Sequence, residues 1–147
     1  MMEIEHLSVR IDESPLNQLL AQRLPEGLSV KELKILLEDS CIGLEGKYAA
    51  SLFSIKFRVE FQPRIEDGKL RVDITNLKIS GMPAALFRNM LMEMIAEQTS
   101  DIPGFSMVDQ SLFFDPHQLL KKENFPLQGS LQKVELGRGY MRLQAGR

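Results

Sequence analysis

The clearest pattern along the chain is a strict alternation of apolar and polar residues near its middle. The apolar positions are Phe53, Ile55, Phe57, Val59 and Phe61, and each residue between them is polar or charged. Because successive side chains of a strand point to opposite faces, this alternation predicts a strand with one apolar face. Such a strand is typical of an antiparallel sheet that is covered on one face only.

The alternation resumes after Asp67-Gly68, a pair that predicts a hairpin turn, and then changes phase. Apolar residues occupy positions 70, 72 and 74, but the next two lie at positions 77 and 79. An extra residue at Thr75-Asn76 would keep these side chains on one face. We therefore expect a β-bulge there, which bends a strand and increases its twist.

The segment from Gly81 to Gln98 predicts a long amphipathic helix. Pro83 suits the first turn of a helix, because the N–H that proline lacks has no partner there. One face of the helix is apolar and consists of Phe87, Met90, Leu91, Met94 and Ile95. Leu86 and Met92 lie outside this stripe and widen it. We therefore expect the helix to lie against, and partly inside, the concave face of a curved sheet.

Two segments far apart in the chain share the pattern of a short helix followed by a hairpin. Ser14 and Asp115, which suit a helix N-cap, each precede a proline, and each segment then reaches Gln-Leu-Leu. Each helix is followed by two alternating segments joined by a turn, at residues 30–46 and 131–146. Two interpretations stay open, a duplicated unit or a chance likeness between common elements.

Residues 105–114 predict a further strand, which gives about seven strands, one long helix and two short ones. Most strands are joined to their sequence neighbours, which is typical of antiparallel pairing. Residues 1–147 therefore predict a single α+β domain. In this domain a strongly curved antiparallel sheet wraps around one long amphipathic helix, with two short helices beside it.

The composition is that of a soluble globular domain, because 44% of the 147 residues are hydrophobic and 26% are charged. A net charge of -2 and the absence of a long basic run argue against nucleic-acid binding. The first residues lack the pattern of a signal peptide, and no apolar run is long enough to span a bilayer. The sequence as given therefore predicts a cytoplasmic protein, unless it is a truncated piece.

Candidate catalytic groups are few. His6 and His117 fall in an edge strand and a short helix, and no Cys, His or carboxylate pair has metal-site spacing. The glycines of Gly137-Arg138-Gly139 lie between two alternating segments, so they predict a hairpin turn rather than a phosphate loop.

The single Cys41 is interpreted as a half-buried structural thiol rather than a reactive one. We expect no catalytic residue, no metal and no cofactor, and hence no enzyme.

Methionine is concentrated around the predicted long helix. The chain contains eight methionines, and Met82, Met90, Met92 and Met94 lie on or beside this segment. Flexible methionine side chains adapt to ligands of different shape, but they also fill gaps between a helix and a curved sheet. The sequence leaves both interpretations open.

The order of these segments resembles bacterial LmeA-like phospholipid-binding domains, relatives of the tubular lipid-binding (TULIP) superfamily. The resemblance spans most of the chain and is most specific at residues 68–83, GKLRVDITNLKISGMP, followed directly by the helix. Members of the superfamily hold lipid acyl chains between a curved sheet and a long helix. The resemblance implies that this space is lined by Phe53, Ile55, Phe57, Val59, Phe87, Met90, Leu91, Met94 and Ile95. Members are usually exported or membrane-attached, whereas this sequence shows no signal or anchor.

Two hypotheses about function follow from these patterns. The first is non-enzymatic binding of a lipid or fatty-acid-like ligand between the long helix and the concave sheet face, with peripheral membrane contact. The alternative is a structural or interaction protein with a fully packed core. Such a protein would form a homodimer through an apolar strip or a strand edge, for which residues 105–114 are a candidate.

Overall fold

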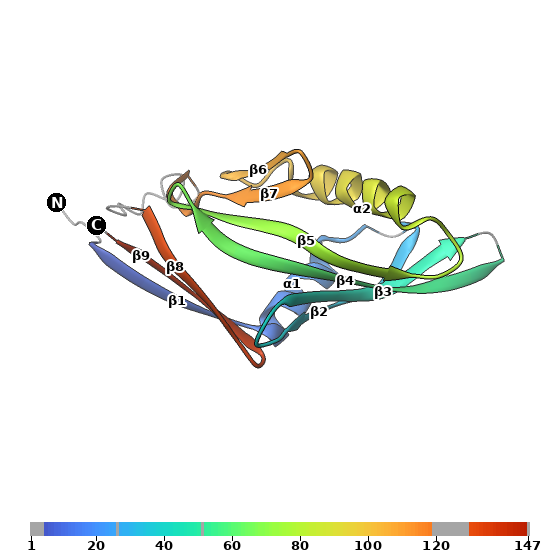
Figure 1. Cartoon of the computed structure of the whole chain (residues 1–147), viewed down its shortest axis with the longest axis horizontal. Coiled ribbons are helices and arrows are strands. Elements are labelled where there is room, and N and C mark those ends of the chain that lie inside the picture. Colours follow the sequence, from blue (N-terminus) through green and yellow to red (C-terminus); the bar gives the residue numbers. More distant parts are fainter. Residues whose placement is uncertain (1–4, 26, 51, 119–129, 147) are drawn as a thin grey trace.

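The computed structural model describes residues 5–25, 27–50, 52–118 and 130–146 of the chain (Figure 1). This part of the protein forms two antiparallel sheets and the helices α1 (Glu13–Arg23) and α2 (Ala84–Thr99). None of the described helices has the length and apolar character needed to cross a membrane.

The larger sheet has six strands in the order β2-β3-β4-β5-β7-β6. These strands are β2 (Val30–Leu37), β3 (Ile42–Ala50), β4 (Phe53–Glu66), β5 (Lys69–Ile79), β6 (Phe105–Val108) and β7 (Ser111–Phe114). The long β4–β5 hairpin lies at its centre and turns at Asp67-Gly68, as predicted. Both turn residues have positive φ, 52° and 76°, the conformation that a tight hairpin turn requires.

The predicted bulge in β5 is confirmed. Glu60 pairs with Asn76 and Phe61 pairs with Ile74, so Thr75 has no counterpart on β4. The extra residue explains why the apolar positions of β5 change from even to odd numbers while the side chains stay on one face.

The smaller sheet brings the two ends of the described chain together. Its strands, in the order β1-β9-β8, are β1 (His6–Asp12), β9 (Tyr140–Gly146) and β8 (Ser130–Gly137). The predicted turn of the β8–β9 hairpin is present, and Gly139 has a φ of 81° there. Strand β1 pairs with β9 over its whole length.

The predicted fold class is wrong in its central feature. The described chain forms two sheets, whereas we expected one strongly curved sheet wrapped around a long amphipathic helix. Helix α2 has 16 residues and lies on one face of the larger sheet, beside β5 and β6 (Figure 1). Its buried residues, Phe87, Leu91 and Met92, lie on one side, while Leu86 is 58% exposed. The helix covers the sheet and is not surrounded by it. The antiparallel α+β character of the prediction remains.

Residues 105–114 form a hairpin, β6–β7, where we predicted one strand. Asp109 and Gln110 make its turn, with φ of 49° and 67°. Two successive positive φ angles mark a type I′ turn, which asparagine and glycine favour. Asp-Gln carries no such signal, which is why the turn was missed.

Two apolar cores hold the fold together. The larger core joins the larger sheet to α2, and its buried members are Val30, Leu44, Phe57, Val59, Phe61, Phe87 and Leu91. The smaller core, made of Leu70, Leu131, Leu143 and Ala145, connects β5 to the smaller sheet. At this junction the Leu131 N–H donates to the Gly68 carbonyl over 3.0 Å.

The two predicted helix caps have different outcomes. Asp115 is a cap, because its Oδ1 accepts a 3.0 Å hydrogen bond from the His117 N–H. Ser14 is not a cap, because α1 already begins at Glu13 and no side chain accepts a capping hydrogen bond at the start of this helix. The Glu13 N–H instead donates to the Gly139 carbonyl of the β8–β9 turn over 3.0 Å. Most of the second short helix, and with it the comparison of the two units, lies outside the described residues.

Candidate functional site

The nine residues predicted to line an acyl-chain space fall into three groups. Five are buried in the core or beside it, namely Ile55, Phe57, Val59, Phe87 and Leu91. Three are partly buried on α2, namely Met90, Met94 and Ile95. Phe53 stands apart at the end of β4 and is 65% exposed. Within the first group, the rings of Phe57 and Phe87 pack together with their centroids 4.7 Å apart.

An apolar cavity of about 240 Å³ lies between α1 and α2, over β2 and β3. One wall comes from α1 and the residue after it, and consists of Leu16, Leu19, Leu20 and Leu24. The sheet and α2 supply the other apolar walls, with Leu33, Ile35, Leu44, Met94, Ile95 and the nearby Ile102. Of the nine predicted residues, Met94 and Ile95 therefore line this cavity.

The leucines of α1 share one helical face without being buried. Leu16, Leu19 and Leu20 occupy positions i, i+3 and i+4, which places them on one side of the helix, and Leu24 follows directly after its last residue. All eleven residues of α1 are described, and none of them is buried. Leu19 is 57% exposed. Helix α1 therefore presents apolar surface to the cavity that the fold itself does not cover.

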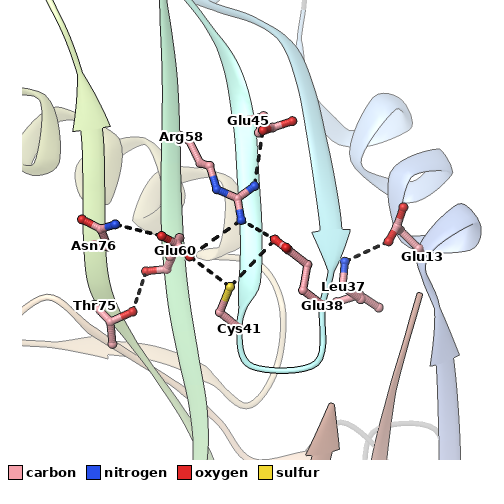
Figure 2. Close-up of polar contacts among 9 residues, drawn as sticks. All are labelled: Glu13, Leu37, Glu38, Cys41, Glu45, Arg58, Glu60, Thr75 and Asn76. Atoms are coloured by element: carbon pink, nitrogen blue, oxygen red, sulfur yellow. Dashed lines mark hydrogen bonds and ion pairs between the residues drawn. The ribbon is translucent and has the colours of Figure 1, made fainter. Parts of the chain in front are cut away.

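Polar side chains attach α1 to the edge strand β2, in addition to the packing of Leu20 against the larger core. The Asn17 amide donates to the Ile35 carbonyl over 2.9 Å and accepts from the Ile35 N–H over 2.7 Å. One turn earlier, the Glu13 carboxylate accepts from the Leu37 N–H over 2.9 Å (Figure 2). The Leu37 carbonyl in turn accepts from the Gly139 N–H over 2.8 Å. These bonds give partners to backbone N–H and C=O groups at the open edge of β2. They also hold α1, which forms one wall of the cavity, in place.

A bulge in β2 supplies a further part of the cavity wall. The pairing of β2 with β3 shifts between Lys31 and Lys34, and Glu32 has a φ of 54°. Leu33 then packs directly over Gly46. A Cβ atom added to Gly46 would lie only 2.8 Å from the Leu33 side chain. Neither the bulge nor this contact has a local sequence signal, so Leu33 was not among the predicted site residues.

Arg23 is the cationic group on the cavity wall. Its Nη2 donates to the Gln98 carbonyl over 3.0 Å and to Asp101 Oδ1 over 2.6 Å, which links the ends of α1 and α2. The Asp101 side chain is 75% exposed. Because exposed ion pairs contribute little stability, Arg23 can exchange this partner for another anion.

A second polar cluster surrounds Arg58 on the other face of the sheet (Figure 2). The guanidinium contacts Glu38, Glu45 over 3.3 Å and Glu60 over 3.7 Å. The hydrogen bond with Glu38 is the main cause of the raised pKa of Arg58. The Cys41 thiol donates to Glu60 Oε2 over 3.3 Å. Burial, the bond to Glu60 and the nearby carboxylates raise the Cys41 pKa, while hydrogen bonds from Asn76 and Cys41 lower the Glu60 pKa.

The raised pKa of Cys41 predicts slow alkylation of the folded protein. The thiolate is the reactive form, and a raised pKa lowers the fraction of thiolate at neutral pH. We expect iodoacetamide to label the native chain more slowly than the chain in urea, with the rate rising at higher pH. Glu60→Gln removes a negative charge, so it should lower the Cys41 pKa and speed only native labelling. Equal rates for native and unfolded chains would contradict a buried, protonated thiol.

Among residues 5–25, 27–50, 52–118 and 130–146, no three His, Cys, Asp or Glu side chains are grouped to hold a metal ion. Comparisons with protein-family models, curated proteins and solved structures found no match to this chain. The function is therefore inferred from the geometry of the cavity and its surroundings.

Proposed function

We propose that this protein binds a ligand with a lipid-like apolar chain in the cavity between α1 and α2. The observation that carries the proposal is the row of α1 leucines that faces this cavity while no residue of α1 is buried. Apolar surface in water is unfavourable by about 25 cal/mol per Å², so a bound chain would stabilise this arrangement. The resemblance to LmeA-like domains leads to the same expectation.

The size of the cavity limits what it can hold. Its volume of about 240 Å³ exceeds that of an engineered apolar cavity of roughly 150 Å³ that binds benzene. It is smaller than the range of about 300–1,000 Å³ that encloses drug-sized ligands. A segment of an alkyl chain fits, and the rest of the ligand would extend through the opening. At about 0.8 kcal/mol per methylene, six buried carbons contribute about 5 kcal/mol before the costs of association.

The position of Arg23 suggests which end of the ligand stays outside. A carboxylate at the opening could pair with its guanidinium in place of the exposed Asp101. We therefore expect the best ligands to be fatty acids, with the chain among the leucines and the carboxylate at Arg23.

The test is fluorescence binding of N-phenyl-1-naphthylamine, followed by its displacement with decanoate. Met94→Glu places a charge in the apolar wall, and we expect it to weaken binding of both probes at least about tenfold. Val108→Glu is the matched control, because Val108 is 56% exposed on β6 and does not line the cavity. Circular dichroism must show that both variants remain folded.

Arg23→Met separates recognition of the chain from recognition of the headgroup. It should weaken decanoate binding while leaving the neutral naphthylamine unaffected, because the apolar walls are unchanged. No saturable binding by the wild-type protein, or equal binding by Met94→Glu, would overturn the proposal.

The alternative of an interaction protein is favoured by one observation, the position of β6 at the outer edge of the larger sheet. Val108 projects there with 56% of its surface exposed. Edge strands pair readily with other strands, so a homodimer through β6 is the form this function would take. Sedimentation equilibrium distinguishes the two candidates, since a dimer that Val108→Glu dissociates supports the second.

A further inference from the structure

Lysines from three neighbouring strands form a row across the larger sheet. Lys31 on β2 pairs directly with Lys47 on β3, which pairs directly with Lys56 on β4. Like charges placed opposite each other destabilise a sheet. Lys47 has an ion pair with Glu32 over 2.9 Å, whereas Lys31 and Lys56 are exposed and pair with no described carboxylate. Stability of the fold therefore does not explain this row.

The next row on the same face is also rich in cations. Arg58 lies two residues after Lys56 on β4 and pairs directly with Lys78 on β5. An open hollow of about 510 Å³ follows these strands, and its charged residues are Lys47, Lys56, Arg58, Lys78, Glu32 and Glu45. Four of the six are positive, although the whole chain has a net charge of -2. Carboxylates offset the charge of Arg58, which pairs with three of them, and of Lys47, which pairs with Glu32. The positive charge that remains on this part of the surface includes that of Lys31 and Lys56, which have no ion pair with a described carboxylate.

Exposed apolar side chains lie at the nearby end of the sheet. Leu52, at the start of the β4 side of the β3–β4 hairpin, is 97% exposed, and Phe53 is 65% exposed. Leu86 in the first turn of α2 is 58% exposed. The start of α2 and the β3–β4 hairpin both lie towards the right in Figure 1. Large apolar side chains that the fold leaves in water mark a contact surface.

We propose that this end of the protein docks on an anionic lipid bilayer, with Leu52 and Phe53 inserted and the row of lysines against the headgroups. The Lys47–Lys56 pair is three residues from the last β3–β4 pair, which at 3.3 Å per residue is about 10 Å. Peripheral elements insert about 5–10 Å into a bilayer, so this spacing places the lysines at headgroup level when the apolar end is inserted.

A bilayer matches both features of this surface. A nucleic acid or an acidic protein would use the lysines but leave Leu52 and Phe53 in water. This docking surface shares no residue with the cavity between α1 and α2, so it stands or fails independently of the proposed ligand.

The test is co-sedimentation with vesicles of phosphatidylcholine, alone or mixed with phosphatidylserine. We expect the wild-type protein to bind the mixed vesicles and to lose binding at high salt. Each lysine near an anionic surface contributes about fivefold to affinity, so Lys31→Gln, Lys47→Gln and Lys56→Gln together should weaken binding about 100-fold. Leu52→Ser with Phe53→Ser should also abolish it. These positions are on the surface, and circular dichroism will verify folding.

The matched control removes three exposed cations from the smaller sheet, through Arg10→Gln, Lys133→Gln and Arg138→Gln. This variant should bind the mixed vesicles as well as the wild type does. Three results would overturn the proposal. They are wild-type binding no tighter to mixed vesicles than to phosphatidylcholine, an equal loss in the control, and lysine-dependent binding of duplex DNA without vesicle binding.

Discussion

Replacing Phe87 with alanine is expected to lower the free energy of unfolding by about 3–5 kcal/mol. The Phe87 side chain is 0% exposed and lies at the centre of the larger core. Its ring is 4.7 Å from that of Phe57 and 6.0 Å from that of Tyr48, in an edge-on arrangement. Truncation removes these contacts and leaves a void that the β4 strand and α2 cannot fill without moving apart.

Urea denaturation followed by circular dichroism measures this effect. Leu86→Ala is the control, because Leu86 is the adjacent residue on α2 and is 58% exposed. It should change the free energy of unfolding by about 0.5 kcal/mol or less. An equal decrease in the free energy of unfolding for both variants would contradict the packing of the Phe87 side of α2 against the sheet.

Asn17→Leu is expected to destabilise the protein by about 1–3 kcal/mol and to loosen α1. The substitution keeps the size of the side chain but removes both hydrogen bonds to the Ile35 backbone. The Ile35 N–H and carbonyl, partly buried under α1, would then lack partners. Since the same bonds hold one wall of the cavity, probe binding should also weaken.

Hydrogen exchange at the Ile35 amide reports this change directly, and we expect it to become at least about tenfold faster in Asn17→Leu. Gln18→Leu serves as the control, because Gln18 is the next residue of α1 and is exposed. Unchanged exchange at Ile35 in the Asn17 variant would show that the side-chain bonds do not protect the edge of β2.

The candidate site was predicted only in part, because its walls come from separate elements. The spacing of the leucines on α1 is visible in the sequence. The strands and the helix that form the other walls of the cavity are not. Met94 and Ile95 were predicted from the apolar face of α2 and do line the cavity. Phe87 and Leu91 belong to the same helical pattern, and Phe57 and Val59 belong to the alternation of β4, but all four lie in the core. Periodicity identifies the apolar face of an element, and does not distinguish a residue in a core from one beside a cavity.

The sequence by itself determined the features that depend on neighbouring residues. These are the alternation of β4, the Asp67-Gly68 turn, the bulge at Thr75 and the Asp115 cap. In each case side-chain direction or local hydrogen bonding restricts the backbone within a few residues.

Only the tertiary structure decided how these elements combine. It paired β1 with β9, divided the strands between two sheets and placed α1 opposite α2 to leave a cavity. It also aligned Lys31, Lys47 and Lys56, which lie on three different strands. Such contacts join residues distant in the chain, and their energies depend on packing and register, which no local pattern records.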